Sequence, residues 1–167
     1  MRRGVRAGLA AAGAVAGIGL LSGCSPAQLP LVAVWLDGDG QPVATVRLCD
    51  GDHGSGVRLH SWAEDDTVAD DNGWSAAFGA RVDVTSATFP LFTPPAAWHV
   101  EAAGQQKLLP GHTYALGFTG PRHGWNPYDG NVSFTSEELH ALHPGQVRAD
   151  DRAMSLGEFE KLAEDSC

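Results

Sequence analysis

Hydrophobic and polar residues alternate with a period of two along much of the chain. The clearest run is 74–84, where Trp74, Ala76 and Phe78 share one face and Ser75 lies on the other. Similar apolar or alternating runs occupy 31–36, 42–49, 57–60, 98–102, 114–118 and 132–134. Such runs are typical of strands with one buried face, and the Gly, Pro, Asp and Asn clusters between them are typical of turns. The pattern therefore predicts a mainly all-β sandwich of about seven strands.

The same alternation predicts which side chains face the core of the sandwich and which face solvent. The predicted outward residues of three strands are Thr45, Arg47, Cys49, Arg58, His60, His99 and Glu101. The predicted inward residues of the same strands are Ala44, Val46, Leu48, Val57, Leu59, Trp98, Val100 and Ala102.

The last third of the chain carries two helix signals. Residues 135–138 read Thr-Ser-Glu-Glu and 155–158 read Ser-Leu-Gly-Glu. Both are capping boxes, in which a hydroxyl residue is followed three positions later by Glu. We expect short helices from Ser136 through Leu142 and from 156 to about 165. The apolar stripe expected on the second helix consists of Leu156, Phe159, Leu162 and Ala163.

A local motif narrows the fold further. The segment 109–116 places Leu-Pro-Gly shortly before Tyr114. It resembles the tyrosine corner of fibronectin type III and related immunoglobulin-like domains. The resemblance implies that the ring of Tyr114 is buried and that its hydroxyl bonds to backbone upstream. Leu116 stands where antibody domains carry their second bridging Cys, so the disulfide of that family is not expected. The predicted fold is an immunoglobulin-like sandwich with one or two C-terminal helices.

The N-terminal segment predicts export. Three Arg residues within 1–6 precede a short apolar stretch rich in Ala and Gly, which ends in Leu-Ser-Gly-Cys at 21–24. This tetrapeptide resembles the lipobox of bacterial lipoproteins, and the resemblance implies cleavage before Cys24 and a diacylglyceryl anchor on its sulfur. An ordinary secretory signal is the alternative. The predicted organisation is a signal peptide at 1–23, a lipidated Cys with a linker at 24–30, and the sandwich at 31–167.

The charge of the chain limits its partners. The sequence has 20 acidic and 11 basic residues, and cleavage before Cys24 leaves eight basic ones and a net charge of −12. An acidic domain without a basic patch is not expected to bind nucleic acid. The expected partners are the membrane, through the lipid on Cys24, and another cell-envelope protein. Abundant Ala and Gly with only two Lys resemble the composition of actinobacterial lipoproteins. The lipobox resemblance implies that the protein lies on the extracytoplasmic face of the cell membrane.

Two cysteines remain after lipidation, Cys49 and Cys167. In an oxidising compartment a leftover pair favours a disulfide. A zinc site is the alternative, but neither Cys lies in a Cys-x-x-Cys or Cys-x-x-His pattern. We therefore predict a Cys49–Cys167 disulfide.

Catalytic and metal-binding motifs are sparse in the sequence. Neither Gly-x-Ser-x-Gly nor His-Glu-x-x-His occurs, and no cofactor is expected. The acidic turns at 37–40, 50–53 and 70–72 have the residue types that Ca²⁺ prefers, but their spacing does not match an EF-hand loop. His140 and His143 are three apart on a short predicted helix, and the other His residues are scattered.

The most suggestive candidate binding element is the loop 119–130. It carries residue types that are common in recognition hot spots, namely Arg122, His123, Trp125 and Tyr128. The alternative is that Trp125 and Tyr128 close the end of the core. We predict a non-enzymatic binding or protein-interaction module, with a metal-binding lipoprotein that uses loop His and Asp residues as the alternative. A third hypothesis is an accessory or inhibitor domain for an exported enzyme.

Overall fold

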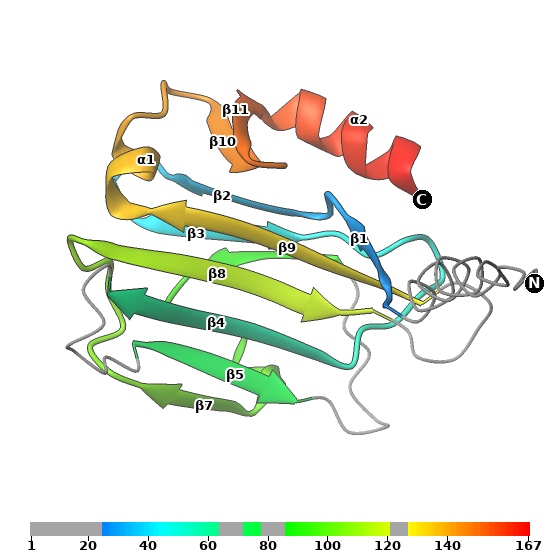
Figure 1. The fold of residues 1–167 in the computed structure, drawn as a ribbon, viewed down its shortest axis with the longest axis horizontal. Coiled ribbons are helices and arrows are strands. Elements are labelled where there is room, and N and C mark those ends of the chain that lie inside the picture. Colours follow the sequence, from blue (N-terminus) through cyan, green and yellow to red (C-terminus); the bar gives the residue numbers. More distant parts are fainter. Residues whose placement is uncertain (1–24, 64–71, 78–85, 121–126) are drawn as a thin grey trace, which may run out of the picture.

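Two β-sheets packed face to face form the body of the protein (Figure 1). The computed structural model describes residues 25–63, 72–77, 86–120 and 127–167. Within them eleven strands, two α-helices and one short 3₁₀ helix follow one another along the chain. The predicted all-β sandwich is confirmed.

The first sheet contains six of these strands. Its order from edge to edge is β1 (Ala27–Leu29), β9 (Tyr128–Thr135), β8 (His112–Thr119), β4 (Gly56–Ala63), β5 (Gly73–Ala77) and β7 (Val100–Ala103). Neighbouring strands run antiparallel except β1 and β9, which are parallel.

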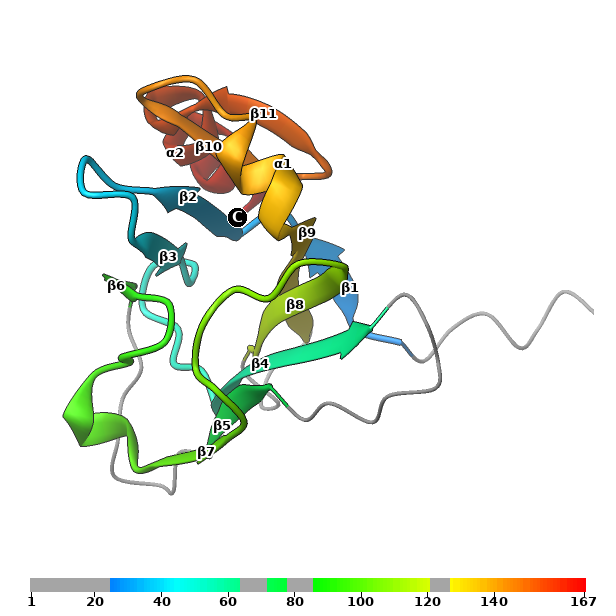
Figure 2. The same ribbon diagram turned by 90° about the vertical axis from the view of Figure 1, so that its left-hand side faces the viewer.

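The second sheet contains the other five strands. Its order is β11 (Arg152–Ser155), β10 (Gln146–Ala149), β2 (Val32–Leu36), β3 (Pro42–Val46) and β6 (Ala87–Pro90). Figure 2 shows β2, β3 and β6 on one side of the sandwich and β4, β8 and β9 on the other. The pairing β2-β3-β6 opposite β4-β8-β9 has the A-B-E and C-F-G arrangement of an immunoglobulin-like sandwich.

The structure has more strands than the seven predicted because several edge strands are very short. Strands β1, β7, β10 and β11 have three or four residues each, too few for a clear alternation in sequence. Strand β1 takes in residues 27–29, part of the predicted linker, and adds them to the edge of the first sheet.

The predicted alternation is confirmed in the central strands. Val57 and Leu59 of β4 are buried, and Arg58 and His60 are exposed. Every second residue of β8 and β9 is also buried, as predicted for Tyr114, Leu116, Phe118, Val132 and Phe134. Residues 74–77 of the longest predicted run lie in β5, and residues 78–84 lie outside the described part.

An aromatic cluster closes the core between the sheets. The ring of Phe89 lies 6.0 Å from that of Trp74 and 4.8 Å from that of Trp98, centroid to centroid. The indole N–H of Trp74 donates to the carbonyl of Leu91 at 2.7 Å, which gives this buried polar group its partner.

The prediction for 98–102 is wrong in part. Trp98 is buried, but it lies in the 3₁₀ helix η1 (Ala96–Trp98), and His99 after it has a left-handed φ of 46°. The chain then continues as edge strand β7. Ala102 pairs with the buried Trp74 and so lies on the predicted inner face, but it is exposed because β7 is at the edge of the sheet.

Two further burial predictions fail. Thr45 of β3 is buried, because its hydroxyl donates to the carbonyl of Ala87 at 3.3 Å and accepts from the hydroxyl of Thr88 at 3.0 Å. Leu156 is 40% exposed because it lies in the first turn of its helix, and the buried residues of that helix are Phe159 and Ala163.

Both predicted helices form with their capping boxes. Helix α1 (Ser136–His140) begins after Thr135, whose hydroxyl accepts from the amide of Glu138. Helix α2 (Leu156–Ser166) begins after Ser155 in the same way, with Glu158 as the reciprocal partner. Helix α1 ends two residues earlier than predicted. Helix α2 lies beside β10 and β11 along the top of the molecule in Figure 1.

The predicted disulfide is present. Cys167, directly after α2, is bonded to Cys49, with a Cα–Cα distance of 5.4 Å. Strand β3 ends at Val46, so Cys49 lies in the connection to β4, where it is half-buried. A surface ion pair between Arg47 and Glu160, 2.7 Å apart, joins the same two segments. These bonds hold the C-terminal helix to the connection between the sheets.

Candidate functional site

The candidate loop at 119–130 is only partly described. Arg122, His123 and Trp125 lie outside the described residues, whereas Tyr128 begins β9. Tyr128 is 6% exposed, and its hydroxyl accepts from the amide of Cys49 at 2.9 Å and donates to Asp52 Oδ2 at 3.0 Å. Burial raises the pKa of this hydroxyl, the hydrogen bond from the Cys49 amide partly opposes the rise, and Asp52 adds to it. Tyr128 thus closes the end of the core, which is the alternative role considered for it.

The residues considered for metal binding are dispersed. Within the described ranges, no three His, Cys, Asp or Glu side chains gather as a metal site. The ring Nδ1 atoms of His99 and His140 lie 3.1 and 2.7 Å from backbone carbonyls of their own turns. In the turn after β2, Asp37 Oδ1 accepts from the amides of Asp39 and Gln41, as expected of a hairpin turn.

A different surface is the best candidate, the outer face of the first sheet. Strand β4 lies in its interior, and Arg58, His60 and Trp62 project from its outer side in a row. We call these three residues the β4 ridge. Trp62 is 44% exposed, one of two large exposed hydrophobic residues in the described chain. The rings of His60 and Trp62 are 5.3 Å apart, with a 30° angle between their planes.

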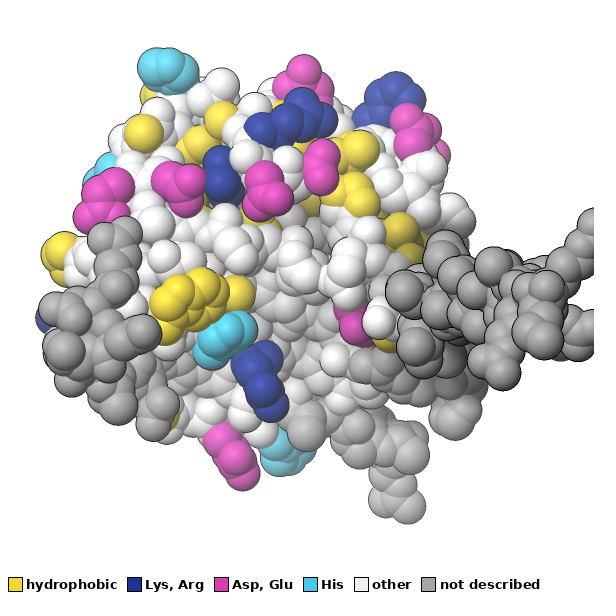
Figure 3. All heavy atoms as spheres, in the orientation of Figure 1, with side chains coloured by type: hydrophobic (Ala, Val, Ile, Leu, Met, Phe, Trp, Pro, Cys, Tyr) yellow, Lys and Arg dark blue, Asp and Glu magenta, His cyan; other side chains and the backbone are white. Residues whose placement is uncertain are grey.

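The ridge stands out because its neighbours in the sheet are small. Arg58 is flanked by Ser75 of β5 and Gly117 of β8, and His60 is flanked by Ala115. A Cβ atom at Gly117 would meet the carbonyl of Gly130 at 3.2 Å, so a larger residue there would crowd the sheet. In Figure 3 this face is mostly white, with hydrophobic, His and basic side chains close together on it.

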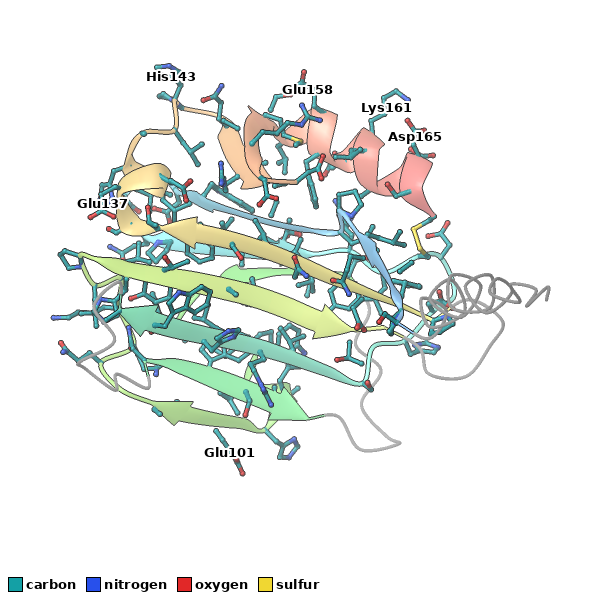
Figure 4. The ribbon with its side chains drawn as sticks, in the orientation of Figure 1. Glu101, Glu137, His143, Glu158, Lys161 and Asp165 are labelled. Atoms are coloured by element: carbon teal, nitrogen blue, oxygen red, sulfur yellow. A yellow bond between two sulfur atoms is a disulfide. The ribbon has the colours of Figure 1, made fainter. Side chains whose placement is uncertain are left out.

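A shallow hollow lies on each side of the ridge. The hollow toward β8 and β9 measures about 570 Å³ and is lined by Arg58 and His60 together with Asp129, Asn131 and Ser133. The hollow toward β5 and β7 measures about 210 Å³, and the two ridge residues line it as well. Glu101, labelled on β7 in Figure 4, borders this smaller hollow. Arg58 and His60 are therefore accessible from both sides.

Arg58 supplies the positive charge that this face offers to a ligand. It has neither a hydrogen bond nor an ion pair with any described residue. Partial burial lowers the pKa of His60, and the positive charge of Arg58 lowers it further. At neutral pH the ridge therefore offers one cation, a neutral imidazole and an indole. A ligand can reach all three without breaking an existing ion pair in the described part of the protein.

The sequence indicated part of this site. The alternation at 57–60 correctly predicts that Arg58 and His60 face outward, but it assigns no role to Arg58, and His60 is one of the scattered His residues. Trp62 was missed because the predicted strand ended at His60, whereas β4 continues to Ala63. Extending the period of two by one step would have added Trp62 to the same face.

No protein-family model, curated protein or solved structure was found to match this chain. The class that the structure itself defines is an all-β, immunoglobulin-like sandwich with a disulfide-linked C-terminal helix. None of the helices in the described ranges has the length and apolar character needed to cross a bilayer.

Proposed function

We propose that this protein is a non-enzymatic binding module displayed outside the cell on a lipid anchor, and that it binds its ligand at the β4 ridge. The observation that carries the proposal is an exposed Trp, His and Arg in one row on an interior strand, with a hollow on each side of the His and the Arg. Trp and Arg are the residue types that contribute most to binding energy at protein surfaces.

The position of the ridge also favours recognition. Strand β4 is hydrogen-bonded on both sides, to β5 and to β8, so its side chains are held on a rigid support. A rigid surface loses little conformational entropy when a ligand binds. The exposed indole of Trp62 supplies apolar area without a large rearrangement of the sheet.

We test the ridge in the Cys24→Ser protein, which cannot carry the lipid, by sedimenting it with isolated bacterial cell envelopes. The double variant Arg58→Gln, Trp62→Ala is expected to bind at least about tenfold more weakly, the loss that follows from removing about 1.4 kcal/mol of contact energy. The control is Arg152→Gln, Leu156→Ala, which changes an exposed Arg and an exposed apolar residue at the other end of the molecule. Equal binding of both variants and the unchanged protein would refute a role for the ridge.

The lipid anchor is a separate part of the proposal, and it rests on the resemblance of 21–24 to a lipobox. Only Ser25 and Pro26 would separate Cys24 from β1, so the domain would sit close to the bilayer. Strand β1 pairs with the start of β9, and Trp62 lies at the opposite end of the sheet. An anchored protein would thus hold Arg58 nearer to the membrane and Trp62 farther from it.

Replacing Cys24 by Ser is expected to release the protein from membranes into the medium or the soluble envelope fraction, because the acyl chains that hold it there are lost. Mass spectrometry of the unchanged protein should show a diacylglyceryl group on an N-terminal Cys24. Cys24→Ser protein that stays in the membrane fraction, together with unmodified Cys24 in the unchanged protein, would exclude a lipid anchor and leave the ridge proposal standing.

A further inference from the structure

We infer that the ligand of the β4 ridge is an acidic saccharide, with its carboxylate on Arg58 and a sugar ring against Trp62. This inference rests on the proposed function, because it names the chemical class that the ridge recognises. It combines the cation, the exposed indole and the hydrogen-bonding side chains that line the larger hollow.

Arg58 determines the sign of the charge that the ligand must carry. The guanidinium group is always charged and binds carboxylates through two parallel hydrogen bonds. Arg58 has no such partner in the described part of the chain, although the protein carries 20 acidic residues. The acidic side chains that line the hollows, Asp129 of β9 and Glu101 of β7, form no ion pair with it. An anionic ligand supplies the missing partner.

Trp62 and His60 favour a ligand that contains a sugar ring. The indole is exposed, and the neutral imidazole lies 5.3 Å from it with a 30° angle between the ring planes, so the two rings form one continuous aromatic surface. The C–H faces of a pyranose pack well on such a surface, while its hydroxyls point to the sides. Arg58 and Trp62 are four residues apart, or roughly 13 Å at about 3.3 Å per residue. This span suits a short oligosaccharide rather than a single sugar.

The larger hollow supplies the hydrogen-bonding groups that sugar hydroxyls need. Asn131 and Ser133 of β9 each carry groups that donate and accept hydrogen bonds. A saccharide uses these groups through its hydroxyls and the cation through its carboxylate. Arg58, with Asn131 and Ser133 beside it and the exposed Trp62 farther along the same strand, therefore fits an acidic sugar better than an apolar ligand.

Two other occupants fit less well. An extended peptide gains much of its affinity by pairing with a free strand edge, but β4 is already paired on both sides. A second copy of the cleaved chain would bring two net charges of −12 together, which opposes association. Both occupants remain as outcomes of the experiment.

The test uses the full chain and isothermal titration with three probes. The first is a set of trisaccharides of glucuronate, galacturonate or mannuronate, the second is the uncharged trisaccharide of the matching hexose, and the third is the peptide Glu-Gly-Glu. We expect at least one uronate trisaccharide to bind and its uncharged counterpart to bind at least about tenfold more weakly. Arg58→Gln should remove this preference, Trp62→Ala should weaken both sugars, and Arg152→Gln should change neither.

The outcomes separate this inference from the proposed function. Tighter binding of Glu-Gly-Glu than of every uronate, or self-association abolished by Trp62→Ala, would overturn the saccharide and keep the ridge as a binding surface. Failure of all uronates to bind at millimolar concentration would overturn the inference as well. If envelope sedimentation is also unaffected by the ridge variants, then the proposed function fails with it.

Discussion

Replacing Cys49 and Cys167 together by Ala is expected to lower the free energy of unfolding by about 4–5 kcal/mol. The disulfide closes a loop with a sequence separation of 118, nearly the whole described domain. A cross-link of this length removes much of the conformational entropy of the unfolded chain, and the stabilisation grows with the logarithm of the loop length. The double replacement is used because a single one leaves a free thiol.

Denaturant unfolding of the oxidised protein, the reduced protein and the double variant measures this effect. Reduction should destabilise the unchanged protein to the level of the double variant and should leave the variant itself unaffected. Phe159 and Ala163 remain buried under α2 without the disulfide, so the helix is expected to stay docked in the folded state. A loss below about 1 kcal/mol would show that residual structure in the unfolded chain already holds its ends together.

Features set by neighbouring residues were predicted well. Both capping boxes formed, because each is a contact between residues three apart in the chain. The tyrosine corner also formed, since the hydroxyl of Tyr114 accepts from the amide of Leu109 at 2.8 Å and donates to the carbonyl of Lys107 at 3.1 Å. The disulfide followed once Cys24 was assigned to the lipid, because only one pairing of the other two cysteines is left.

Features that depend on distant strands were not predictable. The parallel pairing of β1 with β9 joins segments about a hundred residues apart, and nothing in 27–29 indicates it. The hairpin of β10 and β11 was missed because its turn uses Asp150 and Asp151 with φ of 49° and 55°, a conformation that most residues avoid. Strand pairing of this kind is decided by packing between sheets rather than by local preference.

The candidate site also combines a feature that the sequence predicts with one that depends on distant strands. The period-two alternation predicts which face of the sheet a residue occupies, but not which residues of the adjacent strands lie beside it. The ridge exists because Gly117 and Ala115 of β8 and Ser75 of β5 lie next to Arg58 and His60, and that register is a tertiary property. The burial of Tyr128 could not be predicted either, because a Tyr ring is compatible with both the core and the surface. Its place in the core depends on the hydrogen bonds of its hydroxyl with the amide of Cys49 and with Asp52.

Replacing Asn72 by Ala is expected to cost about 2–4 kcal/mol of stability, because it leaves a buried amide unpaired and a small cavity behind. Asn72 is fully buried at 0% exposure. Its side-chain N–H groups donate to the carbonyl of Lys107 at 2.7 Å and to the hydroxyl of Tyr114 at 3.0 Å. Its carbonyl accepts from the amide of Gln106 at 2.9 Å. This residue, which the sequence analysis placed in an acidic turn, in fact completes the tyrosine corner.

The loss should be distributed unevenly among these partners. The carbonyl of Lys107 keeps the hydroxyl of Tyr114 as a donor, whereas the amide of Gln106 loses its acceptor. Hydrogen exchange in the Asn72→Ala protein should therefore accelerate at Gln106 more than at Leu109. Asn131→Ala is the matched control, because Asn131 is exposed and its amide donates to the exposed side chain of Gln28, so its loss should shift stability by only about 0.5 kcal/mol. If Asn72→Ala were no more destabilising than this control, the network would contribute little to stability, and the buried Asn72 would serve only to fix the conformation of the turn before β8.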